Sequence, residues 1–416
     1  MAQLDLSAAS NILKTLYIGP IREQLNNATV LLSKIDRDES TQDVSGKSFT
    51  VPIHSDRNST AGDGRADGGT LATAGVQAYQ NAIVPNKYTY SSIKITGPTI
   101  KAMRTNAGAF VRAVDSEVKG AVRDHKRAMN RQLNGDGRDA IAFWTTADDT
   151  SGTNVDDSQS NSDNHIISGA TYDLIATSDN STKHGDSIVV TLGAEAADGT
   201  TQAITWTGTV ASSADNDYLV REDTLGYQMM GLYGIVNNTD PVVPAGGGTL
   251  TALHGLAVAT YPFWKAQVFG NSGTKRDLTL SLLQKPLSAI AKKSDYSDKD
   301  VKFILSNFPE RDAYVALCVA DKRMVNVMEL DMGFTGVEFN GIPIVPDSQC
   351  RRNTFYYIVP DSLKLFRSGD FSWMDEDGAV LSRVSGTDVY QATLFHYGDL
   401  GTVARNANGL LSDINS

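Results

Sequence analysis

The sequence predicts an α+β fold in which one long helix is followed by a small inserted β-rich subdomain and then by mixed helices and strands. Three observations carry this prediction. Apolar residues recur every three or four positions from Met103 to Leu133, which is the period of a helix with one buried face. From residue 165 the apolar period changes to two, which is typical of short strands. Helical and extended patterns then alternate from residue 279 onward.

The long helix is expected within residues 97–138. Pro98 suits its first turn, because the N–H that proline lacks has no intrahelical partner there. The sequence NGDG at 134–137 predicts the end of the helix, since glycine readily adopts the left-handed conformation that terminates helices. A helix over this whole stretch would be roughly 50 Å long, so we expect it to act as a strut.

The predicted helix is basic although the chain is acidic. Residues 98–138 hold nine Lys and Arg against four Asp and Glu, while the whole chain has a formal net charge of −11. This segregation favours two surfaces that face different surroundings. One interpretation is a surface turned towards DNA by non-specific attraction to phosphates. Its candidate residues are Arg104, Arg112, Lys119, Arg123, Lys126, Arg127 and Arg131.

A simpler interpretation of the same cations also stays open. They could pair with Asp115, Glu117 and Asp124 on a solvated helix face, as charge runs usually do. No aromatic residues alternate with the cations, so base readout is not expected on either interpretation.

A long hairpin is expected to precede the helix, over residues 46–96. One arm has alternating apolar residues from Phe49 to Ile53, and the return strand is expected at 87–95. The tip at 55–69 is polar and rich in glycine. A two-stranded ribbon is marginal alone in water, so we expect it to clamp a neighbouring subunit. The candidate contact residues are Asp56, Arg57, Gly62, Gly64, Arg65, Gly68 and Gly69.

The remaining chain divides by composition. Residues 1–45 have too few apolar side chains for a core of their own and are expected to pack elsewhere. A polar flexible connector is expected at 139–164, and a small β-barrel or sandwich after it. Helices are expected at 279–293, bent at Pro286, and from Pro309 to about Val327.

Several classes of protein are disfavoured by the residues themselves. The longest apolar run, 314–320, is too short to cross a bilayer, and the N-terminus has no secretory signal pattern. The GKS at 46–48 lacks the earlier glycine of a phosphate-binding loop and precedes a strand. The six histidines include no pair at metal-ligand spacing. Cys318 is expected to be buried, whereas Cys350 beside two arginines could have a lowered pKa.

The order of these elements resembles the major capsid proteins of tailed bacteriophages with the HK97 fold. The resemblance covers most of the chain and rests on pattern and order rather than on a catalytic signature. The pieces that carry it are EQLNNATVLLS (23–33), NAIVPNKYTY (81–90), ITGPTI (95–100), GAFV (108–111), DYLVRED (217–223), GLYGIVN (231–237), FNGIPIV (339–345) and DSLKLF (361–366).

The resemblance implies a division of the chain into the parts of that fold. These are an N-terminal arm at 1–45, an E-loop hairpin at 46–96, the spine helix of the P-domain at 97–138, a flexible connector at 139–164, an inserted β-rich subdomain at 165–256, an A-domain with P-domain portions at 257–386 and a C-terminal return strand of the P-domain at 387–416.

The resemblance also implies a function. The chain would be a shell protein without catalytic, cofactor or metal sites, assembling with itself into pentamers and hexamers of an icosahedral head around double-stranded DNA. Scaffolding, portal and decoration proteins are candidate partners, no membrane is involved, and assembly would occur in the cytoplasm of a host bacterium. The alternatives are the shell of an encapsulin-like cellular compartment, a secreted β-rich surface or adhesion protein and, third, an unrecognised hydrolase.

Overall fold

The computed structural model describes residues 29–38, 48–62, 64–71, 73–104, 107–143, 151–153, 166–195, 202–214, 217–238, 242–243, 248–320, 327–330, 334–375 and 381–415. Most of the predicted arm at 1–45 lies outside these residues. Its described part forms α2 (Val30–Lys34) and β1 (Asp36–Asp38). The buried side chains of α2 pack on the long helix, where the Leu32 N–H donates to Asn130 Oδ1 at 3.1 Å.

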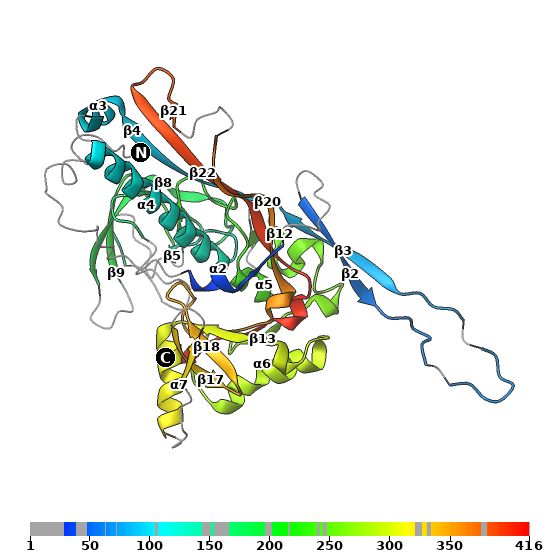
Figure 1. Cartoon of the computed structure of the whole chain (residues 1–416). Helices are drawn as coiled ribbons and strands as arrows, with labels where there is room; N and C mark the ends of the chain where they lie inside the picture. The colour runs from blue at the N-terminus through cyan, green and yellow to red at the C-terminus, as the bar shows by residue number, and fades with distance from the viewer. Residues whose placement is uncertain are drawn as a thin grey trace.

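The long helix packs on a sheet whose strands come from both ends of the chain (Figure 1). The described residues of the predicted helix form two helices, α3 (Gly97–Arg104) and α4 (Ala107–Asn134), rather than one element, and α4, the long helix, is about 42 Å long. The sheet has the order β1-β20-β22-β21, with β4 paired to β22. Its other strands are β4 (Tyr88–Thr96), β20 (Leu363–Trp373), β21 (Ser382–Arg383) and β22 (Val389–Thr402).

The buried face of α4 is the one that its sequence predicts. His125, Met129 and Leu133 are at most 4% exposed, and both nitrogens of His125 lie near strand hydroxyls of β4. Burial lowers the pKa of His125 to about 4. The helix ends at Asn134, and Gly137 has the predicted left-handed conformation, with φ of +84°.

The predicted pairing of the hairpin is wrong. The partner of β2 (Ser48–Asp56) is β3 (Ala78–Pro85), whereas all nine residues of β4 pair with β22. The alternation of β3 explains this, because Ala82 and Val84 lie opposite Val51 and Phe49 and share their buried face. Residue 87 is therefore a corner between two sheets, and the hairpin proper covers 48–85.

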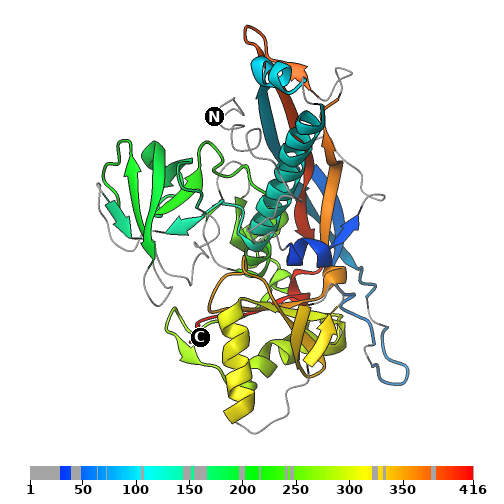
Figure 2. The same ribbon diagram turned by 60° about the vertical axis from the view of Figure 1, so that its left-hand side comes forward.

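The inserted β-rich part is a single antiparallel sheet rather than a barrel or sandwich, and it forms a separate lobe (Figure 2). Its strand order is β5-β10-β7-β8-β9-β6. The strands are β5 (Ala142–Phe143), β6 (Ser151–Thr153), β7 (Thr171–Ile175), β8 (Lys183–Glu195), β9 (Gln202–Thr207) and β10 (Tyr218–Arg221).

The predicted boundaries of this insertion differ from those of the lobe. Strands β5 and β6 lie within the expected connector at 139–164, because short buried pairs such as Ala142 and Phe143 give no period to recognise. The other end is also displaced. Met229 to Val236 and Leu253 belong to the core around α4, not to the lobe. The lobe therefore covers about 141–225 rather than 165–256.

A second, seven-stranded sheet forms the lower part of the molecule in Figure 1. Its order is β13-β23-β19-β15-β18-β17-β16, and α6 (Leu280–Lys293) and α7 (Phe308–Ala320) pack on it. The strands are β13 (Gln267–Phe269), β15 (Phe303–Ser306), β16 (Val327–Leu330), β17 (Phe334–Phe339), β18 (Ile342–Pro346), β19 (Phe355–Ile358) and β23 (Gly409–Leu411).

Two predictions for this region need correction. Val327 begins strand β16 and does not end the preceding helix, whose described part stops at Ala320. The C-terminal segment 387–416 is not one return strand, since β22 joins the long sheet while β23 joins the seven-stranded one. Short elements complete the chain: α5 (Leu232–Val236), β11 (Val242–Val243), β12 (Gly248–Thr249), η2 (Leu250–Gly255), η3 (Pro262–Trp264), β14 (Arg276–Asp277), η4 (Asp298–Asp300), η5 (Pro360–Ser362), η6 (Arg405–Ala407) and β24 (Ile414–Asn415).

Candidate assembly surfaces

The root of the β2–β3 hairpin is part of the protein core. Its inward residues are almost fully buried and form one cluster with side chains from η3, from β20 and from the residue that follows η2. The ring of Phe49 lies 5.6 Å from that of Phe366, and Trp264 Nε1 donates to the Leu253 carbonyl at 3.0 Å. The buried members are Phe49, Val51, Ala82, Val84, Leu256, Trp264 and Phe366. The subunit therefore holds the hairpin firmly at one end.

The outer part of the hairpin leaves this core (Figure 1). On the inward face the burial declines from Val51 to Ile53 and Ser55, and the other face carries Tyr79, which is 66% exposed. Near the end of the ribbon His54 Nε2 lies 2.7 Å from Gln77 Oε1. Apolar side chains on a projecting ribbon are typical of a surface that another chain covers.

The seven candidate residues of the tip are all exposed, from Asp56 at the end of β2 onward. Gly62 and Gly68 have φ of +81° and +72°, so glycine is required there by backbone conformation and not by lack of space. The tip extends to Gln77, further than the sequence pattern suggested. It includes Leu71 and Val76, each 84% exposed, which the sequence analysis missed because they are isolated among polar residues.

A second apolar surface, partly exposed, lies on the long sheet. We call it the aromatic patch: Tyr88, Tyr90, Phe395 and Tyr397. Tyr88 pairs across the strands with Tyr397, and Tyr90 with Phe395, so all four share one face. The rings of Tyr88 and Tyr397 are 5.1 Å apart. Thr89 and Ser91 point instead to His125 of α4, so the patch faces away from the helix. Its residues come from β4 and β22, which are far apart in the sequence, so no local pattern predicts the patch.

The basic residues of the helix do not form one set. The side chains of Arg104 and Arg112 lie outside the described part of the structure, while Lys119, Arg123 and Lys126 are exposed. Lys126 Nζ also lies 5.9 Å from the centroid of the Phe371 ring. The cations that remain candidates for a DNA contact among the described side chains are therefore concentrated at 119–127.

Arg127 and Arg131 are partly buried, and Arg131 forms an ion pair with Asp139. Asp139 also accepts a hydrogen bond from Thr224 Oγ1 at 2.8 Å. Arg131 therefore joins the end of α4 to the two chain segments that lead into and out of the lobe. A cavity of about 50 Å³ with both polar and apolar lining lies at the same junction, which suits a few water molecules rather than a substrate.

The corner between β3 and β4 contains two buried charged groups. Lys87 Nζ donates to the Gly226 carbonyl at 2.7 Å, and Asp399 Oδ1 accepts from the Met230 N–H at 2.6 Å. Burial raises the pKa of Asp399 to about 7, against the lowering effect of Lys87 and the backbone donors. These contacts tie the hairpin root to β22 and to the segment that returns from the lobe.

The sequence predicted the burial of one cysteine correctly and the thiol pKa of the other wrongly. Cys318 is 5% exposed, as expected. Cys350 is fully buried, and burial, followed by the Asp347 and Glu310 carboxylates, raises the pKa of its thiol well above the ordinary value. The expectation of a lowered pKa is therefore wrong.

The guanidinium of Arg351 is stacked 3.9 Å from the centroid of the Tyr233 ring.

Within the described residues, no cluster of three or more His, Cys, Asp and Glu side chains is arranged to hold a metal ion. Likewise, none of the described helices is both long and apolar enough to cross a membrane.

Comparisons with known proteins show which solved structures share this fold. No protein-family model and no curated protein matches the sequence. A chain of the cyanophage A-1(L) capsid asymmetric unit superposes with a TM-score of 0.58 at 15% identity, over 99% of this chain and 100% of that one. The capsid of an empty GTA particle gives 0.49 at 10% identity, over 100% of both chains. The SrpI encapsulin from Synechococcus elongatus PCC 7942 gives 0.47 at 9% identity, over 100% and 97%.

The superposition on the cyanophage chain spans almost the whole length of both proteins. This chain therefore has the fold of a phage capsid subunit, and the resemblance to tailed-phage capsid proteins is confirmed for the fold.

Proposed function

We propose that the protein is the major capsid protein of a tailed bacteriophage, with a structural and not a catalytic role. Its copies would form the pentamers and hexamers of an icosahedral head that encloses double-stranded DNA. One observation beyond the shared fold carries the proposal: the β2–β3 hairpin is anchored in its own subunit at the root and exposes apolar side chains on its outer part. Such a hairpin fits the role of the E-loop, lying on an adjacent copy.

The proposal extends to partners and place. The subunit would contact further copies of itself, packaged DNA without base specificity, and scaffolding, portal and decoration proteins. Its final location would be the virion capsid, after assembly in the cytoplasm of the host bacterium. The domain assignments would follow the fold, with α4 as the spine helix, the long sheet in the P-domain and the seven-stranded sheet in the A-domain.

Electron microscopy of the purified, expressed chain tests the proposal. We expect capsomer rings or closed shells, in the presence of phage partners where these are required. A compact monomer at every concentration would overturn the proposal and favour a surface or adhesion protein. Shells that close around protein cargo and never hold a genome would favour the encapsulin-like alternative instead.

We further predict that Arg123, Lys126 and Arg127 contact packaged DNA. Changing all three to Gln should leave empty shells intact and reduce the full-length genome retained per particle, because non-specific phosphate attraction is lost. The measurement is genome content per particle by absorbance and gel. The matched control removes the same charge from α6, with Lys285, Lys292 and Lys293 changed to Gln. Equal genome content in both triple variants would contradict the prediction.

A further inference from the structure

The lobe at 141–225 is a self-contained module. All buried members of its hydrophobic cluster come from within the lobe, and of the partly buried residues packed against them only Ala140 lies outside it. The chain enters and leaves side by side, since Phe143 pairs with Tyr218 and the Ile141 N–H donates to the Leu219 carbonyl at 2.8 Å. Figure 2 shows it standing apart from both other sheets. In an assembly the lobe would therefore be oriented as one unit.

The chain segment that contains the lobe carries almost the entire net charge of the protein. Residues 141–225 contain 14 of the 48 acidic residues and two of the 37 basic ones. Their formal charge is thus −12, and the remaining chain, with 34 acidic and 35 basic residues, is +1. Seven of the 14 acidic residues are among the described residues of the lobe: Asp173, Asp179, Asp186, Glu195, Asp217, Glu222 and Asp223. The acidity of the whole chain therefore comes from the segment 141–225.

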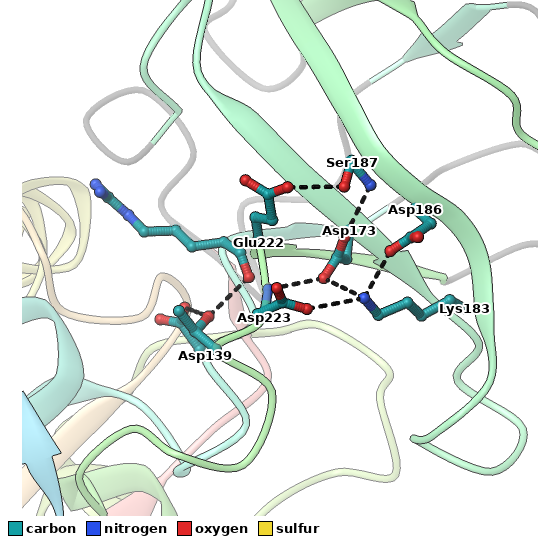
Figure 3. A network of polar contacts seen from close by, with 9 residues as sticks. Asp139, Asp173, Lys183, Asp186, Ser187, Glu222 and Asp223 are labelled. Atoms are coloured by element: carbon teal, nitrogen blue, oxygen red, sulfur yellow. Dashed lines mark hydrogen bonds and ion pairs between the residues drawn. The ribbon is translucent and has the colours of Figure 1, made fainter. Parts of the chain in front are cut away.

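The two basic residues of the lobe do not offset this charge at its surface. Lys183 is surrounded by three carboxylates (Figure 3): its Nζ lies 2.6 Å from Asp186, 2.9 Å from Asp173 and 3.2 Å from Asp223. The other cation, Arg221, is partly buried, and burial followed by the nearby charge of Arg131 lowers its pKa. Arg221 therefore lies near the charged groups Arg131 and Asp139 at the end of α4.

Acidic side chains of the lobe are instead left at the surface. The side chains of Asp186 and Asp223 are 69% and 83% exposed, although both contact Lys183. Asp179 and Glu222 are exposed as well. The described residues of the lobe hold seven acidic side chains against these two cations, so this part of the lobe carries a net negative charge.

We propose that the lobe lies on the outer surface of the assembled shell, away from the packaged DNA. This inference rests on the proposed function. Duplex DNA carries about one negative charge per 1.7 Å of its axis, and packed DNA leaves few positions further from a phosphate than the Debye length of about 10 Å. A segment with a formal charge of −12 facing the interior would oppose packaging at every subunit. On the outside the same charge faces solvent and keeps particles apart in solution.

The experiment uses a cysteine as a marker of the face on which the lobe lies. Both native cysteines are buried, so they give little background reaction. Ala211 and Ala194 are exposed residues of the lobe, and each is changed to Cys in a separate variant, which guards against one variant failing to fold. Lys119→Cys, on α4, provides the comparison site. Intact DNA-filled particles are treated with a maleimide on a polyethylene glycol chain too large to cross the shell.

We expect the lobe cysteines to react at least about tenfold faster than Lys119→Cys in intact particles, because thiol reactivity follows access. All sites should react in particles opened by denaturant. Lobe cysteines that react only after opening would overturn the inference while leaving the shell function intact. Failure of every variant and of the parent to form shells would overturn the proposed function, and the inference with it.

Discussion

Replacing the hairpin tip at 57–77 by a two-residue Asn-Gly turn should abolish shell formation while the subunit remains folded. The turn would join Asp56 directly to Ala78, which are already cross-strand partners. The buried root does not depend on the tip, so the circular dichroism spectrum and the unfolding midpoint should be unchanged. The yield of assembled particles by sedimentation should fall about tenfold or more, since each lost intersubunit contact worth about 1.4 kcal/mol weakens association tenfold.

A milder variant separates the length of the tip from its chemistry. Changing Leu71 and Val76 to Ser keeps the chain length and removes two apolar side chains that the subunit itself does not bury. We expect a partial loss of assembly, because burial of such side chains on a neighbour contributes about 2 kcal/mol each. Shells of normal yield and stability from the shortened hairpin would show that the hairpin is not an intersubunit clamp.

The second large effect concerns Asp399. Its pKa is raised from 3.8 to about 7 in the folded chain, so between these pH values the folded protein binds a proton that the unfolded chain has released. Stability contributed by this group is present below about pH 4 and is lost as the pH rises to about 7. The full loss is on the order of 4 kcal/mol, at 1.36 kcal/mol per pKa unit.

Asp399→Asn should remove this slope, because the amide is neutral at every pH. Urea unfolding of the subunit, compared between the parent and the variant across this pH range, measures the difference. Lys87→Met provides the matching control. It removes the charge that lowers the pKa of Asp399, so the loss of stability should move to higher pH. Identical pH dependence in the parent and Asp399→Asn would contradict the assignment.

The elements that the sequence predicted well are those whose signal is local and repeated. The buried face of α4 follows from spacing alone, as does the helical stop at 134–137, and α6 forms at 280–293 with Pro286 inside it. Short buried strands such as β5 give no period, so the start of the lobe was missed. The shift in the thiol pKa of Cys350 was predicted in the wrong direction, because being next to arginines in the sequence does not indicate whether the thiol is buried.

Tertiary contacts decide which of the candidate contact residues are exposed and which pair within the subunit. Arg131 looked like its neighbours on the helix, yet it pairs with Asp139 at the entrance to the lobe. The tip glycines are exposed as expected, but Leu71 and Val76 were missed because exposed apolar residues have no pattern of their own. The aromatic patch needed a strand from residue 389 onward beside β4, which no local signal encodes.

The sequence by itself determined the fold class, the long basic helix, the projecting hairpin and the separate β-rich module, since periodicity, turn residues and composition are properties of neighbouring residues. Only the tertiary structure decided which strands pair, where the module begins and which charges are neutralised. Those outcomes depend on contacts that no local pattern encodes, whether the partners are close in sequence, as Arg131 and Asp139 are, or far apart, as β4 and β22 are. The segment 141–225 is an example of each. Its formal charge of −12 can be counted from the sequence, but its boundaries follow from the buried core of the lobe.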